Sequence, residues 1–205
     1  MMGKKRSKYR WIRLSLANLF IHLLDGLVTY INTPDLEMEA NILVSRFGYG
    51  WGALFTANLI GFLFIMLMAW DFCRYEHVRI PAKGRFDYYM KLFYGEDYKP
   101  YWCLYKFSRN WNSKLACLSY SVYWGLTIGA VIPVLGWILY MLDIEPSWWH
   151  SMLFSYIVAV TVAYAAYVKW ICDGYEVGRQ QEPDGAKQTE KRGETNEKEE
   201  SSEQL

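Results

Sequence analysis

The chain has 205 residues, which is enough for one domain and too few for two independent cores of ordinary size. Its net charge of +1 and mean hydropathy of −0.05 would suit a soluble protein. Both values conceal an uneven distribution, because some stretches have almost no charged residues and others have many. Ten Trp and seventeen Tyr are present, and many stand beside the ends of the apolar stretches, where aromatic rings favour the water–lipid boundary. This distribution indicates a membrane protein.

Four apolar stretches are long enough to cross the hydrocarbon core of a bilayer as helices, which takes about 20 residues. They cover residues 11–31, 51–70, 116–142 and 149–172, so we predict an all-α fold, a four-helix transmembrane bundle within residues 1–175. Pro133 interrupts the third stretch, and membrane helices tolerate such a kink. A soluble all-α domain is the less favoured alternative, because the second and fourth stretches are apolar nearly all round and leave no face for water.

The first apolar stretch follows a basic N-terminal segment, a combination that also occurs in signal peptides. However, it contains His22 and Asp25 and lacks a small-x-small cleavage pattern. We therefore predict that it is retained as the first membrane span.

The basic residues of the connections predict the orientation of the spans. Residues 32–50 contain only Arg46 against three acidic residues, and the third connection contains only acidic charges, whereas residues 71–115 contain nine basic residues. Basic segments stay in the cytoplasm. This alternation predicts an integral, multi-pass protein of the plasma membrane with both termini in the cytoplasm.

The first span carries an unusual polar stripe. At about 100° per residue, one face holds Ser15, Asn18, His22, Asp25, Thr29 and Asn32. The opposite face holds Leu16, Phe20, Leu23, Leu24, Leu27, Val28 and Ile31. Because lipid cannot satisfy polar groups, the stripe is predicted to face the bundle interior or water.

Asp25 is the most costly member of the stripe, since a charge at this depth costs roughly 2.5 to 3.5 kcal/mol. We expect His22, one turn earlier, to be its first partner. Asn58, Ser155, Tyr156 and the kink at Pro133 fall at similar depths in the other spans, so a polar pocket open to the outer leaflet is predicted.

The alternative is that the polar side chains only join helices by hydrogen bonds. We favour this role for Asn18, Asn58 and Ser155, and a functional role for Asp25 with His22, because helix association does not need an ionisable pair. Close helix packing is also predicted where small residues repeat, at Gly125 and Gly129 in the third span and at Ala159, Ala163 and Ala166 in the fourth.

The residues Asp25, Thr29, Glu39 and Asn41 form the pattern D-x3-T followed by E-x-N. Over roughly the first 70 residues, the chain resembles a family of small prokaryotic membrane proteins of unknown function, whose signature is an intramembrane D-x3-T followed by E-x-N-P. It departs from the family at Ile42, where the signature has Pro. The resemblance implies no reaction, but it adds two residues to the candidate site, which becomes His22, Asp25, Thr29, Glu39, Asn41 and Asn58. Glu39 is expected either to cap the outer mouth of the pocket or to lie in an ordinary solvated loop.

The connection at residues 71–115 interleaves aromatic and basic residues. Phe86, Tyr89, Met90 and Phe93 recur at helical spacing, and Gly95 is placed to end that helix. We predict interfacial helices with the aromatic face toward lipid and the basic residues toward anionic lipid headgroups. Binding of single-stranded nucleic acid is a weak alternative for a loop held between two spans, and no nucleic-acid partner is predicted.

The remaining segments suggest no cofactor. Residues 176–205 have almost no apolar side chains, so a disordered, solubilising cytoplasmic tail is predicted. The four cysteines, Cys73, Cys103, Cys117 and Cys172, fall on the reducing cytoplasmic side and lack C-x2-C spacing, so we expect free thiols and neither a metal nor a cofactor.

Three function classes stay open at this point, because the sequence has no P-loop, dinucleotide fingerprint or hydrolase motif. An accessory or scaffold protein, acting through its loop and tail on a membrane-protein partner, is favoured. The first alternative is a small proton- or cation-linked transporter or channel subunit that uses Asp25 and His22 and forms a homo-oligomer. The second is a membrane-embedded enzyme with Asp25, His22 and Glu39 in acid–base roles.

Overall fold

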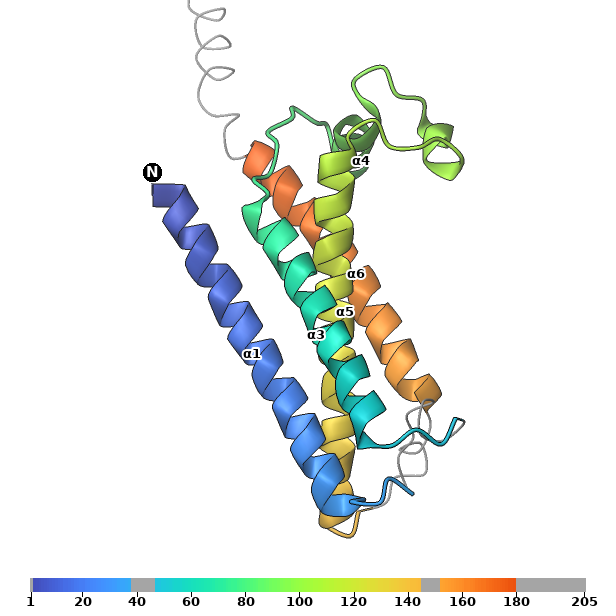
Figure 1. Ribbon diagram of the computed structural model, residues 1–205. Coiled ribbons are helices and arrows are strands. Elements are labelled where there is room, and N and C mark those ends of the chain that lie inside the picture. The colour runs from blue at the N-terminus through green and yellow to red at the C-terminus, as the bar shows by residue number, and fades with distance from the viewer. Residues whose placement is uncertain (1, 38–46, 145–151, 180–205) are drawn as a thin grey trace, which may run out of the picture. The chain divides into compact units, whose positions relative to one another are not determined.

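The computed structural model of the protein describes residues 2–37, 47–144 and 152–179, and every regular element within these ranges is a helix. The elements are α1 (Met2–Asn32), α3 (Trp51–Arg74), α4 (Arg85–Tyr94), the 3-10 helix η1 (Pro100–Leu104), α5 (Trp111–Met141) and α6 (Met152–Arg179) (Figure 1). The predicted all-α fold class is confirmed.

The chain forms two compact units, which we describe separately. The span unit comprises the described residues of Met1–Glu76 and Trp111–Trp170, and the loop unit comprises those of His77–Asn110 and the residues from Ile171 onward. The span unit therefore holds α1, α3, α5 and most of α6. The loop unit holds α4, η1 and the end of α6.

Four of the described helices are long and apolar enough to cross a membrane, so the chain is a multi-pass integral membrane protein. These spans are Tyr9–Asn32, Trp51–Arg74, Trp111–Met141 and Leu153–Arg179. They match the four predicted stretches, but the helices end later or begin earlier than the apolar runs, because hydropathy marks the part of a helix that lies in lipid and not its last hydrogen bond.

Three predicted boundaries change as a result. The helix α3 continues through Asp71, which was assigned to the loop, and α5 begins at Trp111 instead of Ala116. The helix α6 continues to Arg179, past the predicted start of the tail at Glu176. The predicted disorder of residues 180–205 lies outside the described residues.

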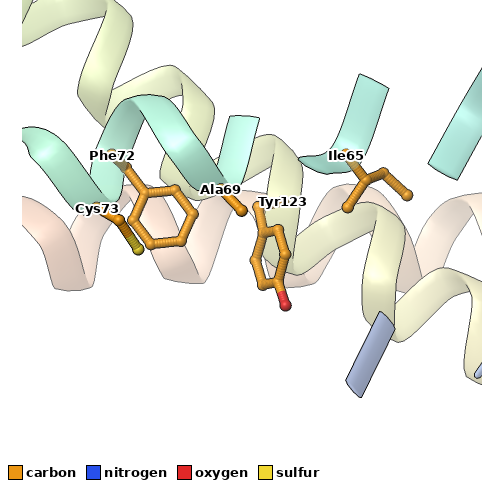
Figure 2. Close-up of a cluster of buried hydrophobic side chains, with 5 residues drawn as sticks. All are labelled: Ile65, Ala69, Phe72, Cys73 and Tyr123. Carbon is orange, nitrogen blue, oxygen red and sulfur yellow. The ribbon is translucent and has the colours of Figure 1, made fainter. Parts of the chain in front are cut away.

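The helices α1, α3 and α5 pack together in the span unit through a cluster of buried side chains. Figure 2 shows this cluster, to which α3 contributes Ile65, Ala69, Phe72 and Cys73 and α5 contributes Tyr123. The Tyr123 ring is 1 % exposed, and its centroid lies 5.4 Å from that of Phe72. Its hydroxyl donates a hydrogen bond to the Leu14 carbonyl oxygen of α1 at 3.2 Å, so this one side chain joins three helices.

Small residues bring α5 and α6 into close contact, as the repeat of Gly125 and Gly129 predicts. A Cβ atom added at Gly125 would lie 2.7 Å from the Ala159 carbonyl oxygen and 2.8 Å from the Ala163 Cβ. At Gly129 the nearest atom would be the Ala159 Cβ, at 3.0 Å. The two backbones can approach this closely only because neither glycine has a side chain.

In the loop unit, α4 agrees with the prediction in part and differs from it in part. The helix ends at Gly95, as expected, where φ is 92° and the Gly95 N–H donates to the Lys91 carbonyl oxygen. However, Met90 and Phe93 of the predicted lipid-facing surface are fully buried. These two residues therefore belong to a packing surface and their predicted insertion into lipid is wrong, whereas Phe86 of the same predicted face is exposed.

Another fully buried ring of α4, that of Tyr88, packs on the end of α6. A Cβ added at Gly174 would lie 2.6 Å from the Tyr88 hydroxyl oxygen, so glycine permits the approach. The same hydroxyl donates a hydrogen bond to the Val78 carbonyl oxygen at 3.1 Å. The aromatic side chain of Tyr88 thus packs inside the loop unit. Sequence spacing alone does not distinguish such internal packing from contact with a membrane.

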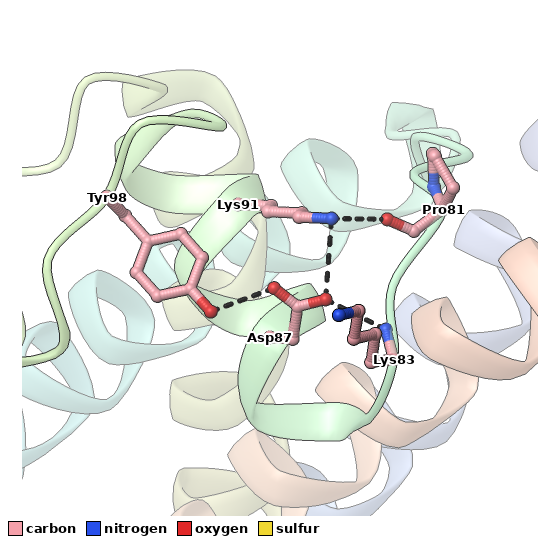
Figure 3. A network of polar contacts seen from close by, with 5 residues as sticks. All are labelled: Pro81, Lys83, Asp87, Lys91 and Tyr98. Atoms are coloured by element: carbon pink, nitrogen blue, oxygen red, sulfur yellow. Dashed lines mark hydrogen bonds and ion pairs between the residues drawn. The ribbon is translucent and has the colours of Figure 1, made fainter.

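A polar network fixes the start of α4 around the carboxylate of Asp87 (Figure 3). Asp87 accepts hydrogen bonds from the Lys83 backbone N–H and the Tyr98 hydroxyl, both at 2.8 Å, and forms an ion pair with Lys91 at 3.4 Å. Burial raises the pKa of Asp87, but the hydrogen bonds and the positive charge of Lys91 together lower it by more, so the pKa lies below its ordinary value.

The network predicts an acid-sensitive start of α4. The pKa of Asp87 is lower in the folded state than in the unfolded state, where it is about 3.9. The stabilisation by its carboxylate is therefore complete above the unfolded pKa and is lost as the pH falls through the folded pKa. We expect Asp87→Asn to destabilise the start of α4 by about 1 kcal/mol near neutral pH. In the original protein the α4 amides should exchange faster below about pH 4, and in the variant this acid dependence should disappear. Hydrogen exchange of the α4 amides, corrected for the intrinsic rate, measures both effects. The exposed Asp97 supplies the control Asp97→Asn, and equal behaviour of the two variants would contradict the assignment.

Candidate functional site

The polar stripe of α1 faces inward, as predicted from helical spacing. Ser15, Asn18 and Thr29 are buried, whereas Leu16, Phe20, Leu23, Leu27 and Ile31 on the opposite face are all more than half exposed. Val28 is an exception, because it was placed on the lipid-facing side and is only 6 % exposed. At about 100° per residue it lies about 40° from Asn32, so it borders the polar face.

A pocket of about 370 Å³ lies between α1 and α3 in the span unit. Its described lining comprises Leu19, His22, Leu23, Asp25, Gly26 and Thr29 of α1 and Trp51, Leu54, Phe55, Asn58, Leu59 and Phe62 of α3. Four of the six predicted site residues, His22, Asp25, Thr29 and Asn58, thus meet at one cavity.

The other predicted residues have different positions. Glu39 and Asn41 lie outside the described residues, so their predicted place at the mouth of the pocket stays a prediction. Ser155, Tyr156 and Pro133 are absent from the described lining. The pocket is therefore formed by two helices, and the predicted contributions from the third and fourth spans to its described wall are wrong.

The described lining residues recur one helical turn apart on each helix, so each helix presents one continuous face to the pocket. On α3 the series is Trp51, Leu54, Phe55, Asn58 and Phe62. At the end of the pocket, the Trp51 indole N–H donates a hydrogen bond to the Pro34 carbonyl oxygen at 2.7 Å, and its ring lies 5.6 Å from that of Tyr30. These contacts tie the start of α3 to the end of α1.

His22 stands against an aromatic wall. Its ring meets Phe62 edge to face, with centroids 5.9 Å apart. Its Nε2 atom is buried and has no hydrogen-bond partner among the described residues. The expected hydrogen bond with Asp25 is therefore not formed through this nitrogen.

Asn18 has the structural role that the sequence favoured. It is fully buried, and its Nδ2–H donates a hydrogen bond to Thr127 Oγ1 of α5 at 2.9 Å. Its Oδ1 atom and the Ser15 Oγ atom, like Nε2 of His22, are buried without a hydrogen-bond partner among the described residues. A series of unsatisfied polar atoms thus follows α1 from the pocket toward its N-terminal half. Buried polar atoms normally have partners, so this series is an exception within the span unit.

The geometry now permits comparison with known proteins. The chain matches no protein-family model, no curated protein and no solved structure. The resemblance carried by Asp25, Thr29, Glu39 and Asn41 accordingly stays a prediction, and the function has to be argued from the pocket.

The aromatic and apolar lining is the part of the site that the sequence analysis missed. Trp51, Leu54 and Phe62 were treated as ordinary span residues, although they share the helical face of Asn58. Extending that face from Asn58 by two turns toward the N-terminus and one turn toward the C-terminus would have found them. In the described part of the chain no cluster of His, Cys, Asp or Glu could hold a metal ion, and the four cysteines are free thiols.

Proposed function

We propose that the pocket between α1 and α3 binds a small organic cation within the membrane, and that the protein is a subunit of a cation- or proton-linked transporter or channel. One observation carries the proposal: Asp25 shares a single, largely apolar pocket with His22, Thr29 and Asn58. An ionisable residue inside a membrane is by default a functional candidate.

The size and chemistry of the pocket support an organic cation. Its volume of about 370 Å³ falls within the range of small-molecule sites. A carboxylate attracts a positive charge strongly in a medium of low dielectric constant, and aromatic rings such as those of Trp51 and Phe62 also attract cations. The many leucine and phenylalanine side chains suit a ligand with an apolar body better than a hydrated inorganic ion.

A cation pocket favours the transporter or channel alternative over the accessory or scaffold role, which needs no ionisable group inside the membrane. The unsatisfied polar atoms of Ser15, Asn18 and His22 support movement of water or protons beside the pocket. An enzyme is less supported, because the described lining places only His22 and Asp25 of the three predicted acid–base residues at the pocket.

Topology and assembly complete the proposal. The pocket occupies the halves of α1 and α3 nearest to their acidic connection, so we place it toward the outer leaflet of the plasma membrane, with both termini in the cytoplasm. Two helices do not enclose a complete pathway, which is why we propose that the protein acts as a homo-oligomer or with a membrane-protein partner.

Binding of benzyltrimethylammonium to the full-length protein in nanodiscs tests the proposal. We expect Asp25→Asn to weaken binding about tenfold or more, because it removes the charge but keeps the shape of the side chain. The apolar isostere neopentylbenzene should bind both proteins equally. Equilibrium dialysis with radiolabelled ligands measures both, after subtraction of partition into empty nanodiscs.

Asp143→Asn is the matched control. It also removes one carboxylate, and Asn tolerates the left-handed backbone at this position, where φ is 56°. It should leave cation binding unchanged. If Asp25→Asn bound the cation as well as the original protein, Asp25 would be a helix contact only, and the accessory or scaffold role would become the better proposal.

A further inference from the structure

The most exposed large apolar side chains in the described part of the chain lie in the loop unit, outside the membrane spans. We call Tyr101, Leu104, Tyr105 and Phe107 the aromatic tip. These four residues lie in η1 and in the three residues that follow it. Phe107 is 88 % exposed and Leu104 is 82 % exposed. On the membrane-spanning helices, whose outer faces meet lipid, no described large apolar side chain exceeds the 71 % of Tyr164. Such exposure indicates a surface that contacts something other than water.

The aromatic tip is held in this exposed arrangement by specific contacts. The rings of Tyr101 and Tyr105 stack with centroids 6.2 Å apart. The Lys106 backbone N–H donates a hydrogen bond to the Trp102 carbonyl oxygen at 2.8 Å. Beyond the tip, the Arg109 backbone N–H donates to the Phe93 carbonyl oxygen of α4 at 2.7 Å. The exposure is therefore a property of a folded turn.

Exposed basic residues lie within and beside the aromatic tip in the chain. Lys99, Lys106 and Arg109 are exposed, and the segment between Lys99 and Arg109 contains no acidic residue. The Nζ atom of Lys106 lies 3.2 Å from the centroid of the Trp102 ring, so its apolar stem is folded against the turn. Aromatic rings with nearby Lys and Arg are the combination that binds the interface of a negatively charged membrane.

We infer that the aromatic tip docks on the anionic lipid surface of the bilayer that holds the spans. Charge complementarity selects anionic headgroups, and Tyr side chains favour the interfacial layer. Chain connectivity selects the same bilayer, because the loop unit is joined to α3 at Arg74 and to α5 at Trp111, and both helices cross the membrane. The interfacial contact predicted for the connection at residues 71–115 is thus made by the tip.

A probe on Cys103 tests this inference. Cys103 is exposed within η1, whereas Cys73 and Cys117 are buried, so in a Cys172→Ser background an environment-sensitive NBD label reports on the tip. The full-length protein is placed in nanodiscs of phosphatidylcholine alone or with phosphatidylglycerol. With the anionic lipid we expect emission at shorter wavelength, several-fold less quenching by iodide, and quenching by spin-labelled lipid.

Three variants make the result specific. Leu104→Ser with Phe107→Ser should abolish the change in emission, and Lys99→Gln with Lys106→Gln should remove its dependence on phosphatidylglycerol. Phe86→Ser, which changes an exposed aromatic residue of α4 outside the tip, should leave it intact. Equal iodide quenching in both kinds of nanodisc would overturn the inference. Protection that requires an added soluble protein would overturn it too, and would assign the tip to a protein partner.

Discussion

Replacing Tyr123 with Ala is expected to lower the free energy of unfolding by about 3 kcal/mol. The ring is 1 % exposed and stands between Phe72, Trp124 and the backbone of α1, so its removal leaves a cavity where three helices meet. Lipid already surrounds apolar groups in the membrane, and the loss therefore comes mainly from van der Waals contacts inside the protein.

Two further variants separate packing from hydrogen bonding at this position. Tyr123→Phe keeps the ring and removes the hydroxyl, which bonds the Leu14 carbonyl oxygen and also contacts Thr127; this should cost about 0.6 kcal/mol for each hydrogen bond lost. Tyr164→Ala removes a ring that is 71 % exposed and should cost little. Steric-trap unfolding in bicelles measures all three. If Tyr123→Phe were as damaging as Tyr123→Ala, the hydrogen bond and not the buried cluster would hold these helices together.

The second large effect is expected at Gly125. A methyl group there would stand 2.7 Å from the Ala159 carbonyl oxygen, which belongs to a helix backbone and cannot rotate away. The helices α5 and α6 must then separate, and we expect Gly125→Ala to cost about 1 to 3 kcal/mol. The same steric-trap measurement, with traps placed on α5 and α6, reports the loss.

Neighbouring glycines supply graded controls for this prediction. At Gly129 the added Cβ would meet the Ala159 Cβ at 3.0 Å, so Gly129→Ala should have a smaller effect. At Gly61 in α3 the added Cβ would meet nothing within 4 Å, so Gly61→Ala should be neutral or slightly stabilising, since Ala favours helix. An order other than Gly125, Gly129, Gly61 would show that the seam yields more easily than its contacts indicate.

The features predicted well from the sequence are those that the lipid solvent dictates. Uncharged runs identify the four spans, because backbone polar groups inside a bilayer must be satisfied within a helix. The same solvent forces the polar side of α1 inward, which is why spacing alone placed Asn18 and Thr29 in the interior. The repeat of Gly125 and Gly129 likewise predicted the α5–α6 contact.

The features predicted poorly depend on contacts between segments distant in the sequence. Residues of α4 such as Phe93 have the composition of an interfacial helix, but their burial is decided by side chains elsewhere in the fold. The pocket was expected among four spans and is lined by two, because depth along a helix does not reveal which neighbour it faces. The i, i+3 spacing of His22 and Asp25 predicts their shared place on one face of α1, and both residues line the pocket.

The length of α5 has a consequence for the host membrane. Its 31 residues extend about 46 Å at 1.5 Å per residue, whereas the hydrocarbon layer is about 30 Å thick. The helix must therefore tilt, project into the headgroups, or stretch the surrounding lipid, and the balance among these responses shifts with acyl-chain length. Any change in the tilt of α5 would reach α6 through the glycine contact, because the two helices approach too closely there to move independently.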